Sequence, residues 1–317
     1  MKQKKFFVTG MAGYLGACLA RELDRASSCK KFYGIDVKEP LAKYKKGEFK
    51  KMDMRDPALV DWIKEVQPDV IVHLAFVVSP ILDEKLMREI NIGGTKNVLK
   101  AVTEAGVKQL IVTSSGTAYG AWPDNPVPLK ETDPIRQHPE FSYARDKAEE
   151  EFVLAEFAKN HPEVILTIIR PCTVCGPHID NYISELFCMP IGISPIGEEP
   201  QGQFVHEDDV VRSILFLAKK EVPGPFNVGP PDILPYSQAN SLVSKPLVPM
   251  PFWLLRICFK VAWRFQLPVL RVPDAFVDFV RYPWVVDSTK IMNLGFEFIY
   301  SSREAFEIMV RVKAGRK

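Results

Sequence analysis

The chain has 317 residues, of which 47% are hydrophobic and 25% are charged, and its formal net charge is +2. This balance is typical of a globular protein with one large or two ordinary domains, and a charge so close to zero excludes any general argument for nucleic acid as a partner. The opening MKQKKFFVTG enters a predicted strand at once and leaves no room for the apolar stretch of a signal peptide. We therefore expect a cytoplasmic protein whose six cysteines stay reduced.

Apolar runs alternate with helical patterns through the first 230 residues. Runs such as DVIVHLAF and QLIVTSS are continuous and rich in β-branched residues, which predicts strands buried on both faces at 5–10, 31–37, 69–76, 109–115 and 164–171. Apolar side chains at helical spacing predict helices at 13–26, 58–67, 81–106, 141–161 and 207–220. The alternation predicts an α/β fold, a Rossmann-type doubly wound parallel sheet covered by helices on both faces.

Three glycines, Gly10, Gly13 and Gly16, lie between the first strand and the first helix. A pyrophosphate needs such a segment, because the glycines permit a tight turn and a close backbone approach while the helix presents free N–H groups. The second strand ends at Asp36, where a carboxylate would accept hydrogen bonds from an adenosine ribose. A carboxylate also repels a 2′-phosphate, so NAD is favoured over NADP, although Lys38 two residues later works against this preference.

The character of the sequence changes after Pro171, where prolines become frequent and periodic runs disappear until about Gly202. The amphipathic stretch 207–220 and a short strand near 226–229 return to the first pattern. We therefore predict an NAD-binding Rossmann domain from residues 1–175 and 204–230. The remaining segments, 176–203 and 231–317, would form a smaller, discontinuous substrate-binding region.

Tyr143 and Lys147 are four residues apart on a predicted helix and share one of its faces. This spacing is common on solvated helices and proves nothing alone. Ser115, however, ends the fifth strand at the carboxyl edge of the sheet, where open α/β sheets bind ligands. A tyrosine with a pKa of about 10 is a poor base at neutral pH, and a downward shift of about three units, favoured by Lys147 and by a positive nicotinamide ring, would bring it into range.

Seven motifs follow one another between about residue 4 and residue 230: TGMAGYLG, HLAF, NIGGTKNVL, TSSGTAYG, YARDK, RPCTVCGP and FVHEDDVV. In this order they resemble the extended short-chain dehydrogenase/reductase family, the NAD-dependent epimerase/dehydratase group. The resemblance implies NAD as cofactor, Tyr143 as general acid/base, Lys147 as the cation that lowers its pKa and holds the nicotinamide ribose, and Ser115 as a hydrogen-bond donor to the reacting oxygen. It also implies a homodimer through the helices at 81–106 and 141–161.

The expected sites can be given by residue. Asp53, after the third strand, is a candidate acceptor for an adenine amino group, with a surface aspartate as the alternative. His73 and Asn91 are interpreted as mainly structural, although in relatives the position of Asn91 lies near the cofactor. Beside the glycines, Asp36, Asp53, Tyr143 and Lys147, the expected cofactor site contains Tyr14, Leu15, Met54, Leu74, Ala75, Asn91, Thr113, Pro171, Thr173 and Val174, and the expected substrate site contains Phe76, Ser115, Thr117 and Cys175.

The sequence departs from relatives that act on nucleotide sugars. Those relatives hold a diphosphate with arginines of the second region, and Gly202 and Gln203 stand where one such arginine and its neighbouring acid are usual. Val277 stands at a second arginine position, although Arg281 is close enough to substitute. A doubly charged diphosphate needs cationic partners, so these losses weaken a nucleotide-sugar interpretation.

Two further departures concern the reaction itself. Dehydratases of the family carry an acidic pair after the Ser/Thr, and this chain has Gly116 and Thr117 there, which argues against dehydration. Cys175 replaces the usual tyrosine before a glycine. Cys172, Cys175 and His178 form a C-x-x-C-x-x-H pattern, but no second ligand cluster lies nearby and a structural zinc normally takes four ligands, so we expect no metal.

The segment 252–265 (FWLLRICFKVAWRF) is strongly apolar, with Arg256, Lys260 and Arg264 along one helical stripe. A helix of this kind is usually buried. The alternative is a wall over a hydrophobic substrate that also makes a peripheral membrane contact through its basic stripe and aromatic face. At about 14 residues the segment is too short to span a bilayer.

We expect an NAD-dependent oxidoreductase that transfers hydride at a secondary alcohol or ketone of a bulky, apolar small molecule, such as a sterol-like, isoprenoid or lipid alcohol. One alternative is a UDP-sugar 4-epimerase that uses the same Ser115, Tyr143 and Lys147 and regenerates its NAD within each turnover. Another is a non-catalytic, NAD-sensing scaffold, against which the intact Ser, Tyr and Lys argue.

Overall fold

The computed structural model describes residues 3–187, 189–197, 199–243, 245–267 and 272–315. Cys188 lies outside these residues. The other five cysteines are free thiols.

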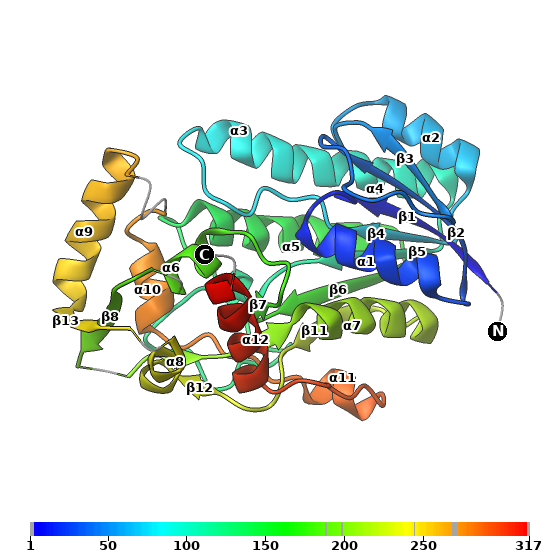
Figure 1. Cartoon of the computed structure of the whole chain (residues 1–317). Coiled ribbons are helices and arrows are strands. Elements are labelled where there is room, and N and C mark those ends of the chain that lie inside the picture. The colour runs from blue at the N-terminus through cyan, green and yellow to red at the C-terminus, as the bar shows by residue number, and fades with distance from the viewer. Residues whose placement is uncertain (1–2, 188, 198, 244, 268–271, 316–317) are drawn as a thin grey trace.

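A seven-stranded sheet forms the centre of the molecule (Figure 1). Its strands are all parallel and lie in the order β11-β6-β5-β4-β1-β2-β3. Apart from β3 at one edge, these strands are largely buried, which explains their continuous apolar runs. The strands are β1 (Lys4–Thr9), β2 (Cys29–Asp36), β3 (Gly47–Lys51), β4 (Val70–His73), β5 (Gln109–Thr113), β6 (Ile165–Pro171) and β11 (Gly224–Val228).

Helices cover both faces of the sheet and create two cores. On one face, side chains of α2 (Ala58–Val66), α4 (Gly94–Ala105) and α5 (Ser142–Asn160) pack against the sheet. On the other face, the core contains side chains of α1 (Tyr14–Arg25) and α7 (Glu207–Lys220). The predicted doubly wound α/β sheet is confirmed, and α7 packs back against it as expected.

Two predicted elements have different limits in the structure. The expected strand 69–76 ends at His73, because the next residues leave the sheet and lie against the glycine turn, where the Leu74 N–H donates to the Thr9 carbonyl. The expected helix 81–106 begins three residues later, with the Asp83 side chain accepting from the Leu86 N–H. It consists of α3 (Glu84–Arg88), a π-helical turn η1 (Glu89–Gly93) and α4, which form one long helix in Figure 1.

The other elements lie mainly at the carboxyl end of the sheet. Three two-stranded sheets, none predicted from the sequence, are formed by β7 with β10, β8 with β13, and β9 with β12. The division into two domains remains a prediction. The elements are η2 (Gly116–Tyr119, 3₁₀), β7 (Thr173–Cys175), α6 (Tyr182–Phe187), β8 (Gly192–Ile196), β9 (Gln201–Gly202), β10 (Phe204–His206), β12 (Leu234–Pro235), α8 (Tyr236–Val243), β13 (Leu247–Pro251), α9 (Phe252–Arg264), α10 (Phe276–Arg281), α11 (Thr289–Asn293) and α12 (Ser302–Gly315).

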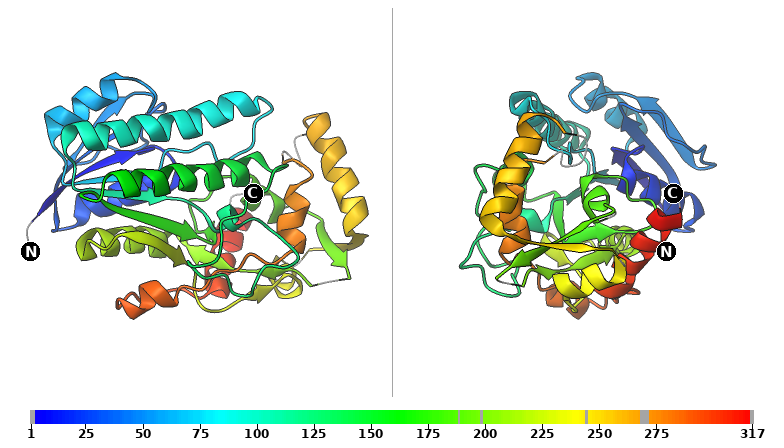
Figure 2. Two further views of the ribbon diagram at one scale, coloured as in Figure 1. Left: turned by 180° about the vertical axis from the view of Figure 1, so that it is seen from behind. Right: turned by 60° about the vertical axis from the view of Figure 1, so that its left-hand side comes forward.

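Helix α9 stands at the end of the molecule opposite the N-terminus (Figures 1 and 2). Leu255, Phe259 and Ala262 are buried, whereas the opposite face is exposed. The expectation of a buried helix therefore holds for one face only. Within the described residues, no helix combines the length and the apolar character that a membrane crossing requires.

Candidate active site

A cavity of about 1170 Å³ runs along the carboxyl edge of the central sheet. One end contains the glycine turn after β1 and Asp36 at the end of β2. The other end reaches Tyr182 of α6 and Phe276 of α10. An elongated ligand in this cavity would pass the ends of β1, β4, β5 and β6, which is the position at which open α/β sheets bind ligands.

The glycine turn is built so closely that side chains are excluded from it. Gly10 has a φ of +73°, and a Cβ there would lie 2.8 Å from the Ala75 backbone. A Cβ on Gly16 would lie 1.9 Å from the Gly10 carbonyl oxygen. Helix α1 begins at Tyr14, directly after Gly13, so its first N–H groups face the cavity end at which a pyrophosphate would gain from them.

Two carboxylates lie at this end of the cavity. Asp36 accepts hydrogen bonds from the Ala12 N–H (3.0 Å) and the Lys38 N–H (3.0 Å), which fixes its carboxylate beside the glycine turn. Asp53 is held by Arg55, whose Nη2 lies 2.7 Å from Oδ2, and this contact lowers the pKa of the Asp53 carboxyl. Asp53 therefore has a strong partner of its own, and its predicted contact with adenine has to compete with Arg55.

Ser115 is held so that its own proton is available. Its Oγ accepts hydrogen bonds from the Thr117 N–H (3.1 Å) and the Thr117 hydroxyl (2.9 Å) at the start of η2. An oxygen that accepts two hydrogen bonds has its single proton left to donate. In this structure that proton faces Tyr143, because a side-chain hydrogen bond of Ser115 lowers the pKa of the Tyr143 phenol.

Tyr143 lies in the first turn of α5 and lines the cavity. Burial raises the pKa of its phenol to about 12; hydrogen bonds with Ser115 and Thr117 act against this shift, and the charge of Glu150 adds to it. The sequence led us to expect a lowered value. The difference arises because desolvation dominates and because the negative charge of Glu150 opposes ionisation of the phenol.

The Lys147 ammonium makes three contacts. It donates to the Thr113 carbonyl (2.8 Å) and to Glu150 Oε2 (2.8 Å), and it lies 3.4 Å from the centre of the Phe76 ring. Burial lowers the pKa of Lys147 and raises that of Glu150. Phe76 also packs edge-on against Tyr143, with ring centres 5.9 Å apart, so the two predicted catalytic side chains share this one aromatic neighbour.

Nearly all of the predicted site residues line the same cavity. The exceptions are Asn91 and Cys175, which are fully buried beside it. Asn91 accepts from the Val77 N–H and donates to Asp146, so it fixes the strand-to-helix segment next to Phe76. The lining residues among those predicted are Gly10, Gly13, Tyr14, Leu15, Gly16, Asp36, Asp53, Met54, Leu74, Ala75, Phe76, Thr113, Ser115, Thr117, Tyr143, Lys147, Pro171, Thr173 and Val174.

The far end of the cavity is aromatic, and the sequence analysis assigned only Phe76 and Tyr143 of its lining by residue. The described cations that line the cavity are Arg21, Lys38 and Lys147, together with His178. None of them belongs to the C-terminal region after residue 230. The apolar composition of that region was the only signal available in the sequence, and the aromatic lining at this end consists of Phe76, Phe141, Tyr143, Tyr182, Phe276, Phe279 and Trp284.

The positions of one missing arginine and of its neighbouring acid are filled by packing. Gln203 is 5% exposed; its Nε2 donates to the Pro230 and Val286 carbonyls (2.8 and 3.0 Å), and its Oε1 accepts from the Val286 N–H (2.8 Å). A Cβ on Gly202 would lie 3.0 Å from the Leu234 carbonyl oxygen. Arg281 lies over the Phe252 and Tyr282 rings and does not line the cavity.

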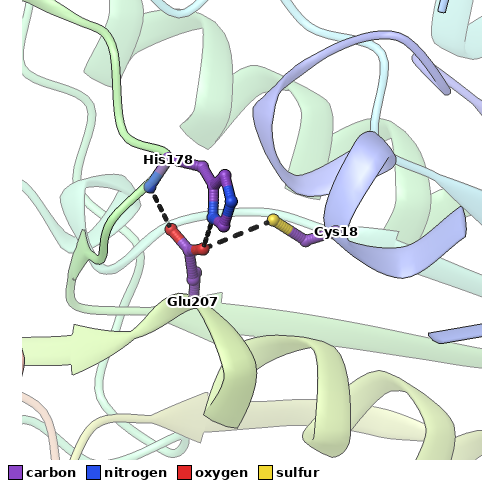
Figure 3. A group of neighbouring side chains, drawn as sticks. All are labelled: Cys18, His178 and Glu207. Carbon is purple, nitrogen blue, oxygen red and sulfur yellow. Dashed lines mark hydrogen bonds and ion pairs between the residues drawn. The ribbon is translucent and has the colours of Figure 1, made fainter. Parts of the chain in front are cut away.

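His178 joins Cys18 and Glu207 (Figure 3). Three potential metal ligands thus come together from α1, the segment after β7 and the start of α7. The Glu207 carboxylate accepts from the His178 Nδ1, the His178 N–H (3.2 Å), the Cys18 thiol (3.7 Å) and the Tyr14 hydroxyl (2.6 Å). The Arg21 guanidinium lies 3.1 Å from the Cys18 Sγ and 2.9 Å from the His178 Nε2. A metal ion bound by these groups would be repelled by the positive charge of Arg21. We therefore interpret the group as a set of hydrogen bonds that links α1 to the segment after β7 and to the start of α7.

Comparison with known proteins decides the family. The sequence matches the NAD dependent epimerase/dehydratase family over residues 6–229, which is more than two thirds of the chain. The chain belongs to this family. It is therefore an NAD-dependent enzyme with the Rossmann fold, as the motifs predicted.

The relatives of this chain include uncharacterized proteins and proteins with a named activity. The chain is 25% identical over 315 residues to the uncharacterized protein Rv0501 of Mycobacterium tuberculosis, covering 96% of this chain and 82% of that protein. It is 30% identical over 206 residues to UDP-glucose 4-epimerase 2 of Arabidopsis thaliana, covering 60% and 57%. The UDP-glucose 4-epimerase of Thermus thermophilus, solved in complex with NAD, superposes with a TM-score of 0.75 at 23% identity, covering 99% and 100%, and shows the shared fold.

The residues of the cavity fit the family's cofactor. The glycine turn leaves space that a Cβ would fill, α1 begins there, and Asp36 is held at the end of β2. The cavity is continuous from this end to Tyr143 and Lys147. Bound there, NAD supplies the redox chemistry, and the chain's own residues determine its orientation and the substrate.

Proposed function

We propose that the enzyme oxidises a secondary alcohol, or reduces the corresponding ketone, on a bulky apolar molecule. The observation that carries this proposal is the composition of the far cavity wall: an aromatic lining without a cation from the C-terminal region. Apolar ring surfaces favour an apolar ligand through burial, whereas a diphosphate needs bidentate cationic partners. The roles of individual residues are part of this proposal.

In the proposed reaction, Tyr143 exchanges a proton with the substrate oxygen. In the oxidation direction Tyr143 would first have to lose its proton, and its phenolate would then accept the alcohol proton as the C=O bond forms, with NAD, held by the glycine turn and Asp36, supplying the hydride acceptor. In the reduction direction the neutral phenol donates that proton. Because the pKa of Tyr143 is about 12, the phenol is the form present at neutral pH, and ketone reduction needs no prior deprotonation.

Ser115 and Lys147 assist this step by position. The Ser115 Oγ already accepts two hydrogen bonds, so its proton can only be donated, and on substrate binding it would turn from Tyr143 to the substrate oxygen. Lys147 is fixed by Thr113 and Glu150, with its remaining donor available for the cofactor ribose. Phe76 contacts both Tyr143 and Lys147 and so helps to hold the two side chains in place.

A second candidate function is epimerisation of a nucleotide sugar. The names of two relatives favour it, since both are UDP-glucose 4-epimerases. Gly202, the hydrogen-bonded Gln203 and the stacked Arg281 argue against it, because none of them lies free to bind a diphosphate.

Binding assays separate the two candidates. The enzyme with NAD bound is titrated with UDP-glucose, UDP-galactose and a panel of sterols and long-chain secondary alcohols, in each case against Phe279→Leu as a variant of the aromatic wall. We expect the apolar alcohols to bind to the wild type and to bind more weakly to Phe279→Leu. The UDP-sugars should bind much more weakly than the alcohols. Tight UDP binding that Phe279→Leu leaves unchanged would overturn the proposal in favour of the epimerase.

Homodimer formation through α3, α4 and α5 remains a prediction.

A further inference from the structure

Exposed hydrophobic side chains gather at one end of the molecule. Among the described residues, half of the large hydrophobic side chains that are exposed lie between residues 191 and 267. A patch of this kind on a protein surface marks a site of interaction. Its members are Ile191, Ile196, Leu247, Val248, Trp253, Ile257, Val261, Phe265 and Leu267.

Helix α9 and the residue that caps its C-terminus, Phe265, carry the centre of this patch. Trp253, Ile257, Val261 and Phe265 follow one another at intervals of four, and their exposed fractions are 66%, 50%, 47% and 71%. Residues at this spacing form a stripe along one side of a helix. The helix therefore presents an apolar stripe outward while its opposite face is buried, and both views in Figure 2 place it at the edge of the molecule.

Along the sequence, the segment that contains this stripe carries basic residues only, although Arg256 is paired with acidic residues of other segments. Between Asp232 and Asp274 the sequence contains no acidic residue, whereas it contains Lys245, Arg256, Lys260, Arg264 and Arg271. Lys260 and Arg264 are exposed on α9 beside the stripe, and neither forms an ion pair within the described part of the chain. An apolar stripe bordered by cations is complementary to a bilayer surface that contains anionic lipids.

The buried face of α9 connects the patch to the cavity. Leu255 and Phe259 pack in one cluster with Tyr182 and with Phe276, and the Phe259 and Phe276 rings are stacked with centres 6.1 Å apart. Tyr182 and Phe276 also line the cavity. The helix is thus separated from the proposed substrate position by one layer of aromatic side chains.

A salt-bridge cluster fixes the helix in this position. Arg256 lies 2.6 Å from Glu140, 3.3 Å from Asp274 and 3.3 Å from Asp278. Glu140 is three residues before Tyr143, and Asp278 belongs to α10, which lines the cavity. A displacement of α9 would therefore be transmitted to the segment before Tyr143 and to α10, both of which border the aromatic end of the cavity.

We infer that α9 docks on the surface of an anionic lipid bilayer, with Trp253, Ile257, Val261 and Phe265 in the interface and Lys260 and Arg264 at the headgroups. The helix lies in the plane of the surface and does not cross it, since its 13 residues are too few. Substrate would then pass from the bilayer to the aromatic end of the cavity. This second step rests on the proposed function, whereas the docking itself does not.

Vesicle sedimentation tests the docking without any reaction. The full-length protein is mixed with vesicles of phosphatidylcholine alone or with phosphatidylglycerol, at low and high salt, beside Ile257→Glu and the control Ile299→Glu, whose isoleucine is exposed on another surface. We expect the wild type to bind anionic vesicles and salt to weaken this binding. Ile257→Glu should lose the binding, whereas Ile299→Glu should keep it. Replacing both Lys260 and Arg264 by glutamine should decrease the affinity for anionic vesicles roughly 20-fold.

Two outcomes would overturn the inference. One is equal sedimentation of Ile257→Glu and the wild type. The other is a protein that ignores vesicles but changes from dimer to monomer on Ile257→Glu in light scattering, which would assign the stripe to a second copy of this chain. Activity assays with NAD and an apolar alcohol, presented either in vesicles or in cyclodextrin, separate docking from chemistry. A protein that binds vesicles but does not oxidise the alcohol in either presentation would support the docking and contradict the proposed function.

Discussion

The Lys147 ammonium lies 2.8 Å from Glu150 Oε2, and both side chains are almost fully buried. The other groups that face Glu150 are Thr95, whose hydroxyl donates to it (3.2 Å), and His73, whose Nε2 lies 3.8 Å away. Burial lowers the pKa of His73 to about 3, so this imidazole stays neutral. The lysine expected to assist Tyr143 therefore has a carboxylate as its immediate partner.

We predict that Glu150→Gln lowers the pKa of Tyr143 by about one unit. The negative charge of Glu150 favours the neutral phenol, so its removal favours the phenolate and leaves the Lys147 charge uncompensated. Asp146 and Glu151 on the same helix also act on Lys147 and are retained. The measurement is an ultraviolet titration of phenolate in the apoenzyme, with the curve of Tyr143→Phe in the same background subtracted.

Glu149→Gln is the matched control for this titration, because Glu149 lies on the surface side of α5 and pairs with Arg88. We expect its phenolate curve to follow the wild type. A purely structural role of Glu150 would lower the melting temperature of Glu150→Gln without moving the curve, and an unchanged or raised pKa of Tyr143 would refute the prediction.

Asp36 should decide the choice between NAD and NADP. We predict that Asp36→Asn raises the Kd for NAD by about tenfold and lowers the Kd for NADP, because a charge-assisted hydrogen bond to the ribose is lost together with the repulsion of a 2′-phosphate. Calorimetric titration of both cofactors measures this, with Asp61→Asn on the exposed side of α2 as control. Parallel changes for the two cofactors would place the ribose elsewhere.

The buried pair of Glu151 and Arg170 should contribute mainly to stability. The Arg170 Nε and Nη2 lie 2.8 and 2.5 Å from the Glu151 carboxylate, which also accepts from the Ser114 hydroxyl (2.6 Å). We predict that Glu151→Gln lowers the free energy of unfolding by about 3–5 kcal/mol, because it leaves a buried guanidinium without its counter-ion. Chemical denaturation of this variant beside Glu149→Gln measures the loss, and a decrease below about 1 kcal/mol for Glu151→Gln would show that the pair is dispensable.

The sequence predicted those features that depend on local pattern. Strand runs, the glycine turn and Asp36 follow from spacing alone, and most of the predicted site residues line one cavity. The end of β4 at His73 could not be predicted, because Leu74 to Phe76 are as apolar as the strand and leave it only to meet Gly10.

Contacts between distant segments were beyond prediction. In the sequence, Glu150 is the middle one of three consecutive glutamates, and nothing local shows that the packing of α4 and β4 against α5 buries it. Likewise, the grouping of Cys18 with His178 and Glu207 joins residues more than 150 positions apart. The sequence left open whether α9 is buried or presents an apolar face, and the structure shows that one face is exposed.

The central claim is that this chain uses Tyr143 and NAD to transfer hydride at an apolar secondary alcohol. Absorbance of NADH during incubation with NAD and a sterol or long-chain secondary alcohol tests it most directly, with the wild type beside Tyr143→Phe. The account predicts NADH in proportion to the ketone formed and a decrease of about 10²–10⁴-fold in the variant, with NAD binding retained. Interconversion of a UDP-sugar without net NADH, together with no oxidation of any apolar alcohol, would contradict it.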